Sequence, residues 1–210
     1  MNIRSLIPYA GLMLLLSACT GFNAVNTRKN HVDIFTSYFP KTDSTIVFFS
    51  PVARLGIPGK WESNYIIRGG NVAELYGLDS LAFGLDVQLV RNFNAYNDTL
   101  PNPERQLLLD CTRQYIESYK AIAPDNIIRI TSDSSASGFI IMRYRDTNSR
   151  DVTVLNGVKK GILYRWYLQS YGPWTKEKRD AFLISAFKNN PLDQNPKILP
   201  EGALKTAVRK

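Results

Sequence analysis

The chain has 210 residues, of which 44% are hydrophobic and 21% are charged, and its formal net charge is +8. These values are ordinary for a globular protein and exclude a disordered or fibrous chain. No internal repeat with a period of about 20–50 residues occurs, which excludes a solenoid or a propeller.

The first segment has the features of an export signal. Arg4 is followed by an apolar run from Leu6 to Ala18, and Cys19 follows directly. As a helix this run would be about 20 Å long, whereas the core of a bilayer is about 30 Å thick. A charged start, a short apolar run and small residues before a break are typical of a secretory signal peptide.

The four residues Leu16-Ser17-Ala18-Cys19 resemble the lipobox of bacterial lipoproteins, in which the cysteine thiol is acylated before cleavage. The resemblance implies that residues 1–18 are a signal peptide and that acylated Cys19 holds the protein on a bilayer, since two or more acyl chains anchor stably. Thr20 follows the cysteine, and by the sorting rule of enteric bacteria this implies the outer membrane, facing the periplasm. The alternatives are an ordinary signal peptide with a chance cysteine, and a cytosolic chain with an apolar start.

The rest of the chain divides into three parts. Residues 19–31 are polar and predict a flexible, lipid-anchored tether. Residues 32–190 predict a single domain, and residues 191–210 predict an extended basic tail. The domain contains one thiol, Cys111, which excludes an internal disulfide.

The first half of the domain predicts strands. A segment of undetermined type at 32–39 precedes a strand at 45–50, and residues 51–59, with two prolines and two glycines, predict irregular structure. Further strands are predicted at 61–68, 71–76 and 81–93. In the last of these, alternating apolar residues predict a sheet with one buried face.

A helix then begins at Pro103, with Asn102 as the expected N-cap, and Pro124 ends it. Its apolar stripe consists of Leu108, Cys111, Tyr115, Tyr119 and Ile122. Strands follow at 126–131 and 138–145, with a hairpin of 151–155 and 161–171 around Asn156-Gly157. A final helix begins at Thr175 and buries an apolar group of Phe182, Leu183, Ala186 and Phe187.

This order of elements predicts the α+β class, an antiparallel sheet with a mid-chain helix and a C-terminal helix packed on it. With the bend Ile57-Pro58-Gly59-Lys60-Trp61, the layout resembles the PsbP-like superfamily. The resemblance implies an α-β-α sandwich and an accessory subunit rather than an enzyme. An NTF2-like cone or a lipocalin variant would show a similar pattern.

Motifs for catalysis and cofactor binding are missing from the sequence. The only histidine, His31, lies at the edge of the tether, and no His-x-x-x-His or Cys-x-x-Cys pair occurs, so neither a metal site nor a histidine-based triad is predicted. No phosphate-binding loop is present, which argues against a nucleotide cofactor, and the export signal argues against nucleic acid. Four scattered carboxylates leave a glycosidase-type pair open: Glu62, Glu74, Asp79 and Asp86.

Aromatic residues are concentrated between residues 164 and 174. In a strand, alternate residues would face the core, and the other set would lie on a partly solvated face with arginines of the same parity on strand 138–145. The predicted binding patch consists of Arg143, Arg145, Arg165, Tyr167 and Tyr171. Cross-strand pairs that only stabilise the sheet are the alternative interpretation.

These observations predict a non-enzymatic lipoprotein of the cell envelope, without a cofactor, that acts as an accessory or partner-binding subunit. An immunity lipoprotein against an envelope toxin is a narrower form of this hypothesis. The alternative is an envelope hydrolase, or a carrier of lipid or another small ligand.

Overall fold

The computed structural model describes residues 33–50, 53–66, 72–77, 81–93, 96–146, 149–170 and 174–189. The described residues form two compact units. Unit 1 contains those between 89 and 165, and unit 2 contains those between 33 and 88 and between 166 and 189. The boundaries between the units fall within two strands, β6 and β10.

Unit 2 begins with a three-stranded antiparallel sheet in the order β1-β2-β3. Its strands are β1 (Asp33–Phe39), β2 (Ser44–Ser50) and β3 (Ala53–Pro58). The prediction of irregular structure is wrong for β3, which pairs with β2 along its whole length. Pro58 is tolerated because it is the last residue of the strand, where a missing backbone N–H costs little.

The predicted strands that follow are confirmed with slightly different ends. They are β4 (Trp61–Ile66), β5 (Val72–Gly77) and β6 (Leu81–Leu89), which pair antiparallel in this order. The prediction of one buried face is wrong for β6, because residues 81–87 are all buried and both of its faces are therefore covered. The 3-10 helix η5 (Val90–Asn92) follows directly.

The C-terminal helix α3 (Lys176–Lys188) begins where it was predicted, since the Thr175 side chain accepts a hydrogen bond from Lys178 N at 3.3 Å. It packs within unit 2 through Phe182, whose ring centroid lies 5.5 Å from that of Phe83 and 5.7 Å from that of Trp61. Trp166 of β10 (Ile162–Ser170) joins this aromatic core, 6.1 Å from Phe187. Rings at these separations contribute both buried area and favourable edge contacts.

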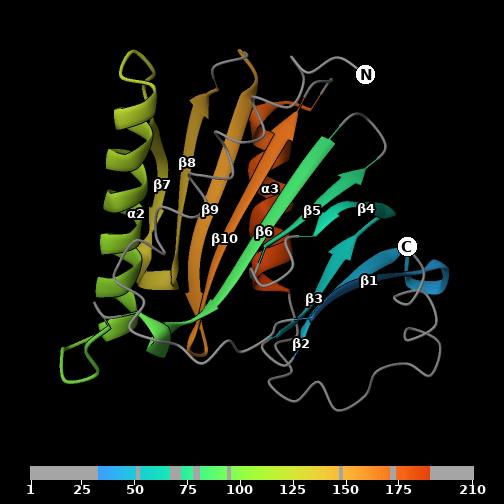
Figure 1. The fold of residues 1–210 in the computed structure, drawn as a ribbon, viewed down its shortest axis with the longest axis horizontal. Coiled ribbons are helices and arrows are strands. Elements are labelled where there is room, and N and C mark those ends of the chain that lie inside the picture. Colours follow the sequence, from blue (N-terminus) through green and yellow to red (C-terminus); the bar gives the residue numbers. More distant parts are fainter. Residues whose placement is uncertain are drawn as a thin grey trace. The chain divides into compact units, whose positions relative to one another are not determined.

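Unit 1 combines the mid-chain helix with antiparallel strands in the order β10-β9-β8-β7. Its elements are α2 (Pro103–Ile122), β7 (Arg129–Ser134), η6 (Ser135–Ser137), β8 (Phe139–Arg145) and β9 (Asp151–Lys159). The helix runs alongside β7 and β8 in Figure 1 and packs on β8 and β9.

The hairpin between β9 and β10 turns later than the sequence predicts. Asn156 and Gly157 lie inside β9, where they pair with Ile140 and Phe139 of β8. The turn is instead at Lys160 and Gly161, whose φ angles are 52° and 74°. Two successive positive φ values are those of a type I′ turn, the form that matches the twist of hairpin strands.

The helix α2 has the predicted ends but differs from the prediction in two details. Asn102 adopts a left-handed conformation with φ 56° and makes no side-chain capping bond. Four residues of the predicted stripe are buried, including Cys111, but Ile122 is 51% exposed. The last turn of α2 therefore extends past the strands that cover the rest of the stripe.

The α+β class, with antiparallel strands, a mid-chain helix and a C-terminal helix, is confirmed. The predicted signal peptide, tether and basic tail lie outside the described residues, as do Cys19 and His31. Their boundaries stay predictions.

Candidate functional site

The structure does not assemble the predicted binding patch, and burial is the first reason. Arg165 and Tyr167 on β10 are only 1% and 2% exposed. The prediction that this face of the strand is partly solvated is therefore wrong. The Tyr167 ring lies directly over Gly84 of β6, where an added Cβ would come within 1.7 Å of the ring. Tyr171, the fifth predicted residue, lies outside the described residues.

The second reason is that the arginines of the patch lie on two faces of the unit 1 sheet. Arg165 points towards α2, since its Cζ lies 5.4 Å from the centroid of the Tyr115 ring. Tyr144 of β8 also points towards α2, with its Oη 2.8 Å from that of Tyr115. Successive residues of a strand alternate between faces, so Arg143 and Arg145 lie on the face away from α2.

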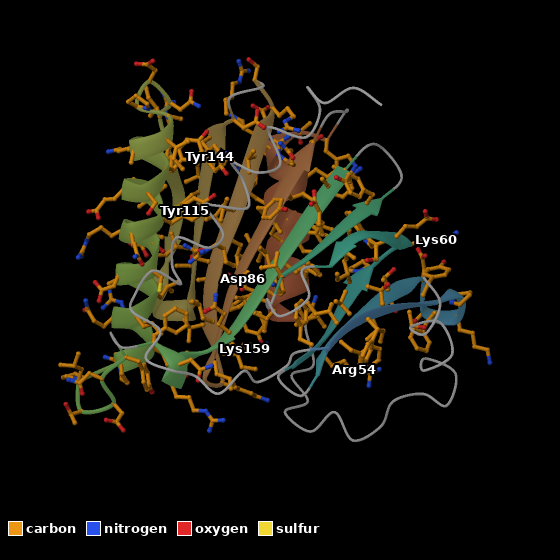
Figure 2. All side chains as sticks on the ribbon, in the orientation of Figure 1. Arg54, Lys60, Asp86, Tyr115, Tyr144 and Lys159 are labelled. Carbon is orange, nitrogen blue, oxygen red and sulfur yellow. The ribbon has the colours of Figure 1, made fainter. Side chains whose placement is uncertain are left out.

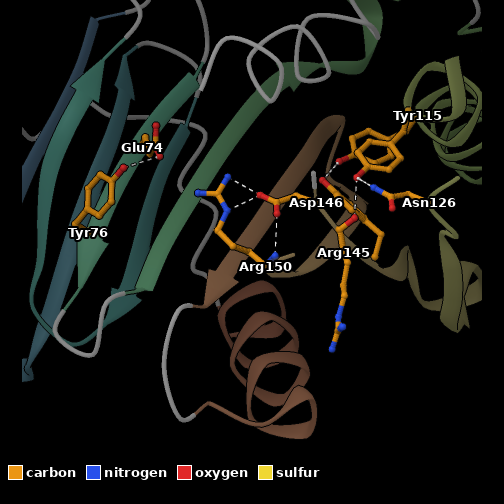
Figure 3. Close-up of polar contacts among 9 residues, drawn as sticks. Glu74, Tyr76, Tyr115, Asn126, Arg145, Asp146 and Arg150 are labelled. Carbon is orange, nitrogen blue, oxygen red and sulfur yellow. Dashed lines mark hydrogen bonds and ion pairs between the residues drawn. The ribbon is translucent and has the colours of Figure 1, made fainter. Parts of the chain in front are cut away.

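The residues beneath α2 form a buried polar cluster (Figure 2). Besides the Tyr115–Tyr144 bond, Asn156 Nδ2 donates to Thr112 Oγ1 at 3.1 Å. Tyr119 Oη donates to the Arg145 carbonyl at 2.8 Å, and Asn126 Nδ2 donates to Tyr119 Oη at 3.0 Å; Figure 3 labels Asn126 and Arg145. These bonds join α2 to β8 and β9, so the cluster positions the helix.

The surroundings of Tyr119 are consistent with this structural role. Burial is the main cause of its raised pKa, a hydrogen bond from Asn126 partly lowers it, and the Asp146 charge raises it further. Burial also raises the pKa of Tyr164 on β10. Both phenols are therefore held in the neutral form, which is the form that donates hydrogen bonds.

The β8–β9 hairpin contains two contrasting ion pairs. Asp146 and Arg150 are bound to each other by backbone and side-chain contacts, and their side chains are only 8% and 11% exposed (Figure 3). Arg145 instead extends away from the tyrosines towards Asp151, with 3.2 Å between Nε and Oδ1 and a side chain that is 72% exposed. Only the second pair is accessible to a partner.

Exposed apolar residues occur at the end of α2 and around the start of β7. Four large hydrophobic residues are strongly exposed among the described residues, and three of them lie between positions 122 and 130: Ile122 at 51%, Ile127 at 67% and Ile130 at 51%. We define the β7 surface as these isoleucines together with three arginines: Ile122, Ile127, Arg129, Ile130, Arg143 and Arg145. The sequence did not reveal this exposure. Ile122, for example, continues an apolar helical stripe and was therefore expected to be buried.

Strand register separates the two chemistries of the β7 surface. Arg129 pairs with Arg143 and therefore shares its face, away from α2. Ile130 pairs with Met142, whose side chain is on the α2 face with Tyr144. The edge strand thus presents arginines on one side and isoleucine on the other.

Two of the scattered carboxylates come together in unit 2. Glu74 pairs with Gly84 and Val72 pairs with Asp86, so both acids share one face as diagonal neighbours on β5 and β6. They are 3% and 2% exposed. Glu74 accepts a hydrogen bond from Tyr76 Oη at 3.0 Å (Figure 3), and Asp86 accepts from Gln88 Nε2 at 2.9 Å.

The other two carboxylates do not join this pair. Glu62 is exposed and lies 3.7 Å from Lys60 Nζ, and Asp79 is outside the described residues. Within the described ranges no group of three or more His, Cys, Asp or Glu residues could hold a metal ion. Over the same ranges no helix has the length and hydropathy needed to cross a bilayer.

Comparison with known proteins finds similarity in structure but not in sequence. No family model matches the chain, and no curated protein sequence matches it significantly. The structure is similar to the solution structure of cyanobacterial PsbP (CyanoP) from Synechocystis sp. PCC 6803. The TM-score is 0.43 at 8% identity, over 77% of this chain and 94% of that chain.

Proposed function

We propose that this protein is a lipoprotein of the bacterial cell envelope that binds a partner protein and is not an enzyme. In this proposal Cys19 carries the acyl chains, and the protein is held on the outer membrane, facing the periplasm. The partner is a second envelope protein, bound by unit 1. An immunity lipoprotein is the form of this function in which the partner is a toxin.

The exposed isoleucines of the β7 surface are the observation that supports partner binding. Burial of one large aliphatic side chain contributes about 1.5–3 kcal/mol, and three such residues lie between positions 122 and 130. Exposed aliphatic side chains and arginines are both typical of binding surfaces, and here Ile130 and the arginines lie on opposite faces of the same edge strand. The lipobox residues Leu16–Cys19 supply the argument for the membrane.

Metabolic labelling tests the anchor. Cells that express the protein are grown with radioactive palmitate, and the chain is compared with its Cys19→Ser variant. We expect label in the first and none in the second, because the thiol is the acylation site. An unlabelled wild-type chain would contradict the proposed lipid anchor and, with it, the membrane location.

Crosslinking in intact cells tests partner binding. The wild-type chain is purified after crosslinking and compared with Ile130→Asp and with Leu100→Asp, a matched control at an exposed leucine elsewhere in unit 1. We expect Ile130→Asp to reduce recovery of the crosslinked partner at least tenfold, and Leu100→Asp to leave it unchanged. Equal recovery in all three would contradict binding at the β7 surface.

An envelope hydrolase is the second candidate, and the Glu74–Asp86 pair is the observation that favours it. Diagonal neighbours on adjacent strands are about 7–8 Å apart, within the range of about 5–9.5 Å that glycoside cleavage requires. Both acids, however, are buried and accept side-chain hydrogen bonds, as structural carboxylates do. Loss of cell-wall hydrolysis in both Glu74→Gln and Asp86→Asn would favour the hydrolase.

A further inference from the structure

We infer that the partner adds an extended strand to the edge of β7 opposite β8, with acidic side chains towards the arginines and apolar side chains towards Ile130. This inference rests on the proposed partner-binding function and names the chemistry of the partner. It follows from the position of β7, from its strand register and from its charges.

The position of β7 provides the backbone groups. β7 is the last strand in the order β10-β9-β8-β7, and β8 is its one neighbour in that order. An edge strand presents a row of N–H and C=O groups that can pair with a further strand. Proteins commonly use such an edge to bind an extended segment of a partner.

The surroundings of the edge are consistent with strand addition. Four of the six residues of β7 are exposed. Ile122, at the end of α2, and Ile127, just before β7, are 51% and 67% exposed, so both are accessible to an added strand. β7 is six residues long, so a partner segment of four to six residues fits this edge.

Register determines which side chains the partner should carry. An added strand continues the alternation of faces across the sheet. Its residues on the face away from α2 would lie near Arg129 and Arg143, and the residues between them would lie near Ile130. A segment that alternates acidic and apolar residues satisfies both sides at once.

The charges on the arginine side favour acidic residues. Arg129 is exposed and Arg143 is partly exposed, and these two residues are directly paired across β7 and β8. Arg145 lies two residues further along β8 and is paired with Asp151. Three guanidinium groups gather on this side of the edge, so acidic side chains would complement them and basic ones would be repelled.

Synthetic peptides test the inference. The full mature chain, in detergent, is titrated with a labelled octapeptide that alternates glutamate and valine, and binding is measured by fluorescence anisotropy. We expect a Kd below about 1 mM, and no measurable binding of the peptide in which lysine replaces glutamate. Arg143→Glu and Ile130→Ser should each weaken binding about tenfold, whereas Leu100→Ser should have no effect.

N-methylated peptides distinguish strand addition from simple adhesion. Methylation of either the glutamate or the valine amides removes the N–H groups from one edge of the peptide. Because a strand pairs with β7 through one edge, one of the two methylated peptides should bind at least tenfold more weakly and the other like the parent. Equal binding of both, or no binding of the parent peptide, would overturn strand addition.

These outcomes are separate from those of the proposed function. If Ile130→Asp abolishes crosslinking in cells while both methylated peptides bind like the parent, the partner binds the β7 surface without adding a strand. If Ile130→Asp leaves crosslinking unchanged, the proposed partner binding at the β7 surface is itself contradicted, whatever the peptides show.

Discussion

Unit 1 contains two groups of arginines on one sheet, with opposite surroundings. Arg165 lies beneath α2, 1% exposed, with its guanidinium 5.4 Å from the centre of the Tyr115 ring. Arg129 and Arg143 lie on the other face, at the edge strand, and are accessible to solvent. All three belong to strands with similar alternating sequences, and the sequence pattern alone suggested that Arg143 and Arg165 lie together.

The comparison shows that the position of an arginine in the sheet decides its role. In the middle of the sheet a helix covers the strand, and the buried guanidinium is held against an aromatic ring. At the edge, β7 has β8 as its neighbour in the strand order, and four of its six residues are exposed. Arg165 stabilises the fold, whereas Arg129 and Arg143 lie on an accessible face at the edge.

The largest expected effect distinguishes Arg165 from Arg143. Arg165→Ala removes a fully buried side chain and its contact with Tyr115, and we expect a loss of about 3 kcal/mol in the free energy of unfolding. Arg143→Ala should change that free energy by less than about 0.5 kcal/mol. Urea unfolding of both variants measures the difference, and equal losses would contradict the assignment of roles.

The two ion pairs of the β8–β9 hairpin give the same comparison between a buried and an exposed arginine, each paired with an aspartate. Arg150→Ala leaves the buried Asp146 carboxylate without its partner and should destabilise the protein by about 3 kcal/mol. Arg145→Ala breaks a solvent-exposed pair and should cost less than about 1 kcal/mol. Thermal unfolding in low and high salt checks this. A larger loss for Arg145→Ala would mean that the exposed pair supports the hairpin.

Two buried tyrosines of unit 1 predict that its stability is sensitive to alkaline pH. Burial raises the pKa of Tyr119 and Tyr164 above the ordinary value of 10.0. Between the unfolded and folded pKa values the unfolded chain has lost the proton and the folded chain retains it, so stability should fall as the pH rises above about 10. Urea unfolding at pH 8 and pH 11 measures the fall, which Tyr164→Phe should reduce. An unchanged fall in this variant would contradict the burial argument.

The smallest effect is expected at the edge. Ile130→Ser should change the free energy of unfolding by less than about 0.5 kcal/mol, because the side chain is 51% exposed. Ile141→Ala on β8, fully buried, should cost about 3 kcal/mol. Guanidinium unfolding of the two variants compares them, and a large loss for Ile130→Ser would show that β7 packs more tightly than its exposure indicates.

Most elements could be predicted from the sequence, since the local signals were strong. Pro103 and Pro124 bracketed α2, and Thr175 marked the start of α3. The turn at Asn156-Gly157 was wrong because tertiary pairing with β8 and the bond to Thr112 keep both residues inside β9. Residues 53–58 form a strand despite Pro58 because β2 provides a partner along their length.

The candidate site was predicted only in part. Arg143 and Arg145 lie on an accessible surface as expected, but Arg165 and Tyr167 do not. Parity within one strand is visible in a sequence, whereas the relation between the faces of two strands depends on their pairing register. The exposed isoleucines could not be recognised either, because exposure of an apolar residue depends on what packs over it.

The sequence by itself determined most of the secondary structure, the α+β class and the presence of a lipobox-like segment, because these depend on residues close together in the chain. Tertiary structure alone decided which arginines are buried and which strand forms the edge of unit 1. Those properties depend on strand order, register and helix packing, which join residues such as Tyr115 and Tyr144 that are distant in sequence.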